Sequence, residues 1–223
     1  MTTRSAFSFR YGVFDNDGTL VDTMGHCGRI FAETLAPYGI AEEDARSHYF
    51  STTGRPMAEQ YGQILSHHGI EAGAALFAAL RDDFGAKFLE IDAPFFPGAK
   101  RCISALADAG LMLFVSSAAS DACTWKRIAG SGVADRFTLA YGSSALPKGP
   151  LHLAAFAKIA RVSIEEFAGN AFLCGDGEAD MAIANAAGMY AIGVDGTVGE
   201  ARIRAAGARR VVTAVGELLA DAR

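Results

Sequence analysis

Near its start the chain reads Phe14-Asp15-Asn16-Asp17-Gly18-Thr19-Leu20, which overlaps the end of the apolar run Tyr11–Phe14. The apolar run predicts a short buried strand, and Gly18 permits the unusual backbone conformation of a tight turn after it. In open parallel sheets, ligands bind beyond the carboxyl ends of the strands. Asp15 and Asp17 therefore lie where a reactive group is expected, although the motif alone does not distinguish a reactive pair from an ordinary Asp-rich turn.

The spacing of the two aspartates favours chemistry that needs two different carboxyl groups. Carboxylates one residue apart in a buried turn repel each other, and a divalent cation between them would relieve that repulsion. One carboxylate can then attack as a nucleophile while the other donates and later accepts a proton. The spacing therefore predicts that one of Asp15 and Asp17 is a nucleophile and the other a proton shuttle, without deciding which is which.

The composition is typical of a globular enzyme and excludes several other classes. Of 223 residues, 51% are hydrophobic and 20% charged, and the net charge of −5 leaves no basic surface for nucleic acid. No apolar run is long enough to span a membrane, so we expect no membrane partner. Cys27, Cys102, Cys123 and Cys174 are scattered, which predicts neither a zinc site nor disulfides and fits a cytoplasmic protein.

Apolar runs alternate with helical patterns over most of the chain. The predicted strands are Tyr11–Phe14, Leu111–Val115, Phe137–Tyr141, Ala171–Cys174 and Tyr190–Val194. The predicted helices are Arg101–Asp108, Ala122–Gly130, Leu151–Ala160 and Asp180–Ala187. This alternation predicts an α/β protein with a parallel sheet that helices cover on both faces.

Residues 23–93 interrupt that alternation with helical patterns only, at Cys27–Tyr38, Met57–His67 and Ala72–Glu90. We expect a catalytic core formed by residues 1–22 and 94–223, and a separate helical domain formed by residues 23–93. The alternative is that these helices belong to the outer layer of the sheet.

Polar groups follow three later strands as well. Ser116 and Ser117 end the second apolar run, Lys148 lies in a Pro/Gly-containing loop, and Asp176 and Asp180 follow the run Ala171–Cys174. Each group has an ordinary explanation, such as a helix cap, an exposed lysine or an acidic helix start. Their order is harder to explain by chance, because hydroxyl and ammonium groups suit phosphoryl oxygens and carboxylates suit Mg²⁺.

These residues resemble the haloacid dehalogenase superfamily, in particular its phosphatase branch with an α-helical cap. Asp15-Asn16-Asp17-Gly18-Thr19 is similar to the first motif of the family, Ser116 to the second, Lys148 to the third, and Gly175-Asp176 through Asp180 to the fourth. The resemblance covers nearly the whole chain. It implies a Rossmann-like core, a cap formed by the helical insert, and Mg²⁺-dependent hydrolysis of a small phosphomonoester.

The resemblance also implies a role for each matching residue. Asp15 would form an aspartyl-phosphate, and Asp17 would protonate the leaving alcohol and then activate water. Ser116 and Lys148 would bind the phosphoryl oxygens, with Ser117 beside them. The Mg²⁺ ligands would be Asp15, the backbone carbonyl of Asp17 and Asp176, with Asp180 binding directly or through water.

The substrate and some details stay open at this stage. Asn16 replaces the usual apolar middle residue, and Lys148 is followed by Gly149 rather than proline. A phosphoglycolate-phosphatase-like or sugar-phosphate role is our best interpretation, with Arg55 of the polar stretch Ser51–Pro56 reaching the substrate tail or simply lying exposed. We expect a monomer or weak homodimer.

Two other functions share these motifs. A hexose-phosphate mutase is the principal alternative, because it uses the same core and differs in how the cap excludes water. A phosphate-binding regulator without turnover is disfavoured, because nucleophile, acid, cation and metal ligands are all present. Asp17 also argues against carbon–halogen chemistry, since a dehalogenase would lack this second acid.

Overall fold

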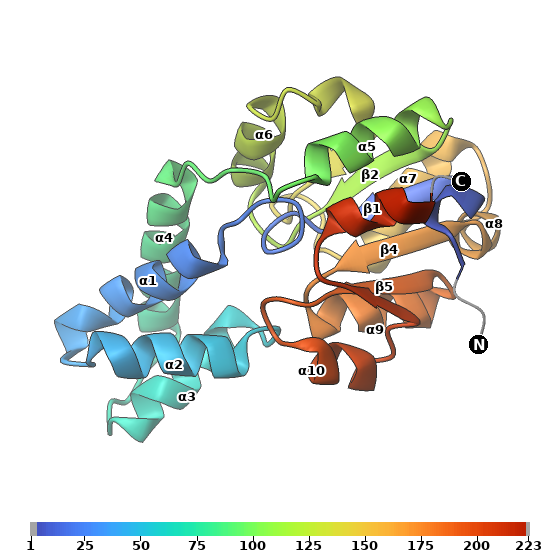
Figure 1. Ribbon diagram of the computed structural model, residues 1–223. Coiled ribbons are helices and arrows are strands. Elements are labelled where there is room, and N and C mark those ends of the chain that lie inside the picture. Colours follow the sequence, from blue (N-terminus) through green and yellow to red (C-terminus); the bar gives the residue numbers. More distant parts are fainter. Residues whose placement is uncertain (1–3, 222–223) are drawn as a thin grey trace. The chain divides into compact units, whose positions relative to one another are not determined.

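The computed structural model describes residues 4–221. The chain folds into two compact units. The first unit comprises Met1–Asp22 and Ala93–Arg223, and the second comprises Thr23–Asp92. Figure 1 shows the parallel sheet and its helices in the first unit and a group of helices in the second. Among the described residues, no helix combines the length and the apolar character needed to cross a membrane.

The sheet of the first unit has six strands in the order β3-β2-β1-β4-β5-β6, and every neighbouring pair is parallel. The strands are β1 Tyr11–Phe14, β2 Met112–Ser116, β3 Leu139–Tyr141, β4 Ala171–Gly175, β5 Tyr190–Val194 and β6 Arg210–Val212. The first strand lies in the middle, because Val13 pairs with Phe114 of β2 on one side and with Leu173 of β4 on the other. The predicted α/β fold with a parallel sheet is confirmed.

The helices of this unit follow the strands in alternation. They are α5 Ala99–Asp108, α6 Asp121–Ala129, α7 Pro150–Ala160, α8 Ile164–Gly169, α9 Glu178–Ala187 and α10 Glu200–Ala205, with the short 3₁₀ helices η1 Ala6–Ser8, η3 Ala134–Arg136 and η4 Val215–Asp221. The sixth strand, α8 and α10 were not predicted. The strand β6 has three residues and begins at Arg210, which an edge strand tolerates and an apolar-run criterion misses.

Successive side chains of the central strands contribute to two different apolar clusters, as expected for alternation across a sheet. Phe14 packs with residues of α5 and η4, including Ile103. Val13 packs with residues of α7 and α9, including Phe156. The two clusters bury both faces of the sheet, so the polar groups that follow the strands are left at its carboxyl edge.

The turn after β1 is a closed loop built on Asn16. The carbonyl oxygen of Asn16 accepts hydrogen bonds from the amides of Leu20 and Val21, each at 2.9 Å. Gly18 has φ of 82°, a left-handed conformation that a side chain disfavours, and its amide donates to the Val21 carbonyl at 2.9 Å. The closed turn fixes the positions of Asp15 and Asp17 at the edge of the sheet.

The second unit is helical throughout its secondary structure. It contains α1 Met24–Leu35, η2 Ala36–Tyr38, α2 Glu42–Thr52, α3 Met57–His67 and α4 Ala74–Glu90. Its core includes Phe31 and Tyr61, whose rings stack with centroids 4.5 Å apart. The expected polar loop Ser51–Pro56 is partly wrong, because α2 continues through Thr52. Within the last turn of α2, the Thr52 hydroxyl donates to the His48 carbonyl at 2.7 Å.

Candidate active site

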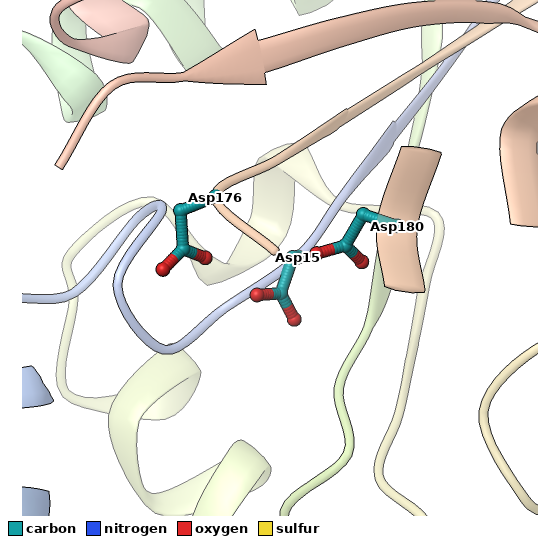
Figure 2. A group of neighbouring side chains, drawn as sticks. All are labelled: Asp15, Asp176 and Asp180. Carbon is teal, nitrogen blue, oxygen red and sulfur yellow. The ribbon is translucent and has the colours of Figure 1, made fainter. Parts of the chain in front are cut away.

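Three aspartates from separate segments form a buried cluster at the carboxyl edge of the sheet. Asp15 follows β1, Asp176 follows β4 and Asp180 lies in the first turn of α9. One carboxylate oxygen of each lies within 4.8 Å of the others, and all three residues are buried. Figure 2 shows how the three carboxyl groups gather in one place. We refer to Asp15, Asp176 and Asp180 as the acidic cluster.

Lys148 joins two members of the acidic cluster. Its Nζ lies 2.7 Å from Asp15 Oδ1 and 2.6 Å from Asp180 Oδ1. Burial by itself lowers the pKa of an ammonium group, but the two carboxylates outweigh burial and raise the pKa of Lys148 above its usual value. The lysine therefore stays charged in this interior position.

The acidic cluster remains more negative than one lysine can balance. Burial, followed by the charges of the neighbouring aspartates, raises the pKa of Asp176 well above its ordinary range. Burial also raises the pKa of Asp180 to about 6, with Asp15 adding to the rise and Lys148 opposing it. Three close carboxylates whose oxygens converge are the donor set that a hard divalent cation prefers, so the residues present fit a metal such as Mg²⁺.

Two threonines fix the orientation of Asp176. Thr19 donates its hydroxyl to Asp176 Oδ1 at 2.8 Å, and Thr197 donates its hydroxyl to Asp176 Oδ2. Gly175 allows α9 to fold back beside the strand, because a Cβ at this position would lie 2.4 Å from Cγ of Asp180. These contacts hold the acidic cluster in place through neutral groups.

Asp17 lies on the β2 side of the turn, with both carboxylate oxygens engaged. Its Oδ2 accepts hydrogen bonds from Asn16 Nδ2 and from Ser117 Oγ, each at 3.3 Å. Its Oδ1 lies 3.6 Å from Nε of Arg127, whose side chain is only 4% exposed. The predicted proton shuttle is therefore paired with a guanidinium group that no motif indicated.

Ser116 is buried at the end of β2 and bonded to a histidine that the sequence analysis did not assign. His152, in α7, has Nε2 within 2.8 Å of the Leu146 carbonyl and 3.1 Å of the Gly142 carbonyl, and both oxygens require a donor. Burial lowers the pKa of His152, so the ring is neutral and Nδ1 is an acceptor. The Ser116 hydroxyl, 2.8 Å away, therefore donates to His152.

The remaining predicted residue belongs to the second unit. Arg55 is half-exposed and forms an ion pair with Glu59 at 3.0 Å, one helical turn further along the chain.

Within the first unit, Glu178 pairs with Arg202 through both of its oxygens, at 3.0 Å and 2.9 Å. The structure thus brings together Asp15, Asp17, Ser116, Ser117, Lys148, Asp176 and Asp180 at one edge of the sheet.

The sequence carried unequal signals for the residues that were missed. Thr197 follows β5, so the same strand-end argument that located Asp176 would have located it. His152 is four residues after Lys148, on a helix that starts between them. Arg127 has a weaker signal, which is a charged residue beside the buried Ile128 on the helix α6.

The central Asp-x-Asp turn, the acidic cluster and Lys148 define a class of hydrolase built on a parallel α/β sheet. Comparison with known proteins identifies the family, because residues 13–194 match the model of the haloacid dehalogenase-like hydrolases. The chain belongs to this family, and the predicted membership is confirmed.

One relative agrees with this assignment, and two solved structures share the fold. The probable phosphatase IndB of Dickeya dadantii (strain 3937) is 30% identical over 189 residues, which cover 82% of this chain and 79% of that protein. A predicted phosphoglycolate phosphatase from Haemophilus somnus has the same fold, with a TM-score of 0.79 at 18% identity, over 97% of this chain and 99% of its own. CbbY from Rhodobacter sphaeroides has a TM-score of 0.70 at 23% identity, over 96% of this chain and 98% of its own.

Proposed function

We propose that this hydrolase is a Mg²⁺-dependent phosphatase that cleaves a small phosphomonoester through an aspartyl-phosphate on Asp15. The observation that carries the proposal is the arrangement around Asp15, which has Lys148 at 2.7 Å and two further carboxylates within reach of one cation. The phosphatase named among the relatives, the Dickeya protein, supports the same reaction class. The Haemophilus protein, named as a predicted phosphoglycolate phosphatase, favours a substrate of that size.

In the proposed first step, a carboxylate oxygen of Asp15 forms a bond to phosphorus while the bond from phosphorus to the alcohol oxygen breaks. Asp17 gives its proton to the departing oxygen. Lys148 holds Asp15 in place and offsets the negative charge of the phosphoryl oxygens. Mg²⁺, held by Asp15, Asp176, Asp180 and the Asp17 backbone carbonyl, would supply further charge neutralisation.

In the proposed second step, Asp17 takes a proton from water, and the water oxygen attacks phosphorus. The bond from phosphorus to Asp15 breaks, which releases inorganic phosphate and restores both aspartates. Ser116 is proposed to bind a phosphoryl oxygen, and this requires its hydroxyl hydrogen to turn away from His152. Arg55 lies in the other unit, and its predicted contact with the substrate stays a prediction.

The proposal is tested by phosphate release from a panel of small phosphomonoesters with Mg²⁺ and with EDTA. Asp15→Asn should lower the turnover by at least ~10⁴-fold, because it removes the nucleophile. Asp135→Asn, a change at an aspartate whose side chain is 82% exposed, serves as the matched control. Acid quenching during turnover should trap phosphate on the wild-type protein and not on Asp15→Asn.

Other outcomes identify the alternatives. If Asp15 accepts phosphate from a sugar bisphosphate and passes it to a sugar phosphate without release, the protein is a mutase. If Asp15→Asn hydrolyses the esters as fast as the wild type, the aspartyl-phosphate mechanism is wrong.

A further inference from the structure

The helix α6 places a positive charge in the protein interior that the chemistry described above does not use. Arg127 is 7% exposed as a whole residue, whereas its neighbours Trp125 and Lys126 face solvent. Arginine is rarely buried, and removing its charge from water costs several kcal/mol unless a carboxylate and hydrogen bonds compensate. A buried guanidinium is therefore expected to serve a particular partner.

The partner is Asp17, and the guanidinium lies beside it. Nε of Arg127 lies 3.6 Å from Asp17 Oδ1, while Nη1 donates to the Cys123 carbonyl of the same helix at 3.2 Å. The helix itself is anchored at its start, since Asp121 Oδ1 accepts the Gly142 amide at 2.8 Å. The guanidinium thus has little freedom to move relative to the edge of the sheet.

The two oxygens of Asp17 are held from different directions. Asn16 and Ser117 donate to Oδ2, whereas Arg127 faces Oδ1. Rotation of the carboxyl group would disturb both sets of contacts, so its orientation is fixed before any substrate binds. Proton transfer depends strongly on such orientation, and a misplacement of about 1 Å can cost ~10²-fold in rate.

We propose that Arg127 is a positioning residue for Asp17, which holds the carboxyl group where it can protonate the departing alcohol. This inference rests on the proposed function. The bonds of Arg127 itself do not change during the reaction, because the guanidinium neither gives up nor accepts a proton. Through Asp17 it bears on both the departure of the alcohol and the later activation of water, and only the first of these steps differs from one ester to another.

The inference predicts a dependence on the leaving group. A nitrophenolate departs readily without protonation, whereas an alkyl alcohol needs the proton of a well-placed acid. We expect Arg127→Met to lower kcat/KM for 2-phosphoglycolate by ~100-fold and for p-nitrophenyl phosphate by less than ~5-fold. The ratio kcat/KM is the appropriate measure, because it excludes the later hydrolysis of the aspartyl-phosphate that both esters share.

Three variants accompany the measurement. Asp17→Asn should show the same selective loss with the alkyl ester, and Arg127→Lys should recover part of the loss by restoring a charge. Arg101→Met, which removes an exposed arginine from α5, should leave both ratios unchanged. If Arg127→Met fails to fold by circular dichroism, the comparison of the two esters is made with Arg127→Lys.

Several results would overturn the inference. An equal loss with both esters would assign Arg127 to folding alone, and no loss would remove its role altogether. A selective loss for Arg127→Met without one for Asp17→Asn would mean that Arg127 acts on another group. If the wild-type protein hydrolyses no ester of the panel, these two included, the proposed function fails, and the inference that rests on it fails as well.

Discussion

On the β4 side of Asp15, three carboxylates share the single ammonium group of Lys148, whereas on the β2 side Asp17 faces the guanidinium of Arg127. The first region has more carboxyl groups than cations, whereas in the second region one carboxyl group faces one cation. An excess of converging carboxyl groups provides a place for a cation, while a one-to-one pair fixes the direction of a single acid. Two neighbouring regions of one sheet edge thus use the same residue types for different purposes.

The largest expected effect breaks the balance in the first region. Lys148→Met should lower the free energy of unfolding by about 3–5 kcal/mol in EDTA, because it leaves buried carboxylates without their cation. Mg²⁺ should restore part of this loss, since a bound ion at about 100 times its Kd adds ~2.7 kcal/mol. Urea unfolding with and without Mg²⁺ measures both quantities.

Two comparisons make this prediction specific. Lys158→Met, at an exposed lysine of α7, should unfold like the wild type. Mg²⁺ should stabilise Arg127→Met no more than it stabilises the wild type, because that pair lies outside the acidic cluster. If Mg²⁺ stabilises Lys148→Met and the wild-type protein by the same amount, the acidic cluster does not have the excess of negative charge that we infer.

A smaller effect is expected at the hydroxyl that orients Asp176. Thr197→Val keeps the shape of the side chain and removes its hydrogen bond, so Mg²⁺ affinity should fall by ~10-fold, or about 1.4 kcal/mol. Titration calorimetry measures the affinity directly. Thr213→Val removes a similar hydroxyl that donates to Glu217, and it should leave Mg²⁺ binding unchanged. Unchanged affinity in Thr197→Val would show that Thr197 does not orient the metal ligands.

The smallest effect is expected at His152 and vanishes near neutral pH. The pKa of His152 is lowered by burial, so protonation favours the unfolded chain, where the pKa has its usual value near 6.5. His152 therefore does not reduce the free energy of unfolding above about pH 6.5. Below that pH, the free energy of unfolding decreases as the pH falls towards the folded-state pKa. The slope of the loss is at most about 1.36 kcal/mol per pH unit.

Urea unfolding of the wild type and of His152→Gln is measured between about pH 7.5 and about pH 5, in steps of roughly half a pH unit. The dependence of the free energy of unfolding on pH reports proton binding. The other titrating groups contribute to both proteins, so the difference between the two curves isolates His152. Parallel curves would mean that the ring is not held neutral by the fold.

Much of the sheet was predictable, because buried parallel strands are short apolar runs. Tyr11–Phe14 and Tyr190–Val194 were predicted to the residue. The strand β6 was not, because Arg210 begins it and an edge strand need not be apolar. Thr52 was placed in a loop because polar residues favour turns. It lies in the last turn of α2 instead, with its hydroxyl bonded to the His48 carbonyl.

Three of the predicted site residues share a property that two of the missed ones, Arg127 and His152, lack. Asp15, Ser116 and Asp176 lie at or just after strand ends, where topology places them together whatever their side chains do. Arg127 and His152 lie within helices, and their importance comes from side chains that reach partners across the fold. Sequence spacing reports the first kind of proximity and is silent on the second.

The central position of β1 has a consequence for the protein as it is being made. Asp15 is synthesised early, but Lys148 follows 133 residues later and Asp176 later still. At the usual rates of translation, on the order of ten seconds separate the nucleophile from its lysine. A nascent chain released or cleaved before Lys148 would carry the reactive aspartate without the lysine and the later aspartates that surround it, so such fragments should have no hydrolase activity.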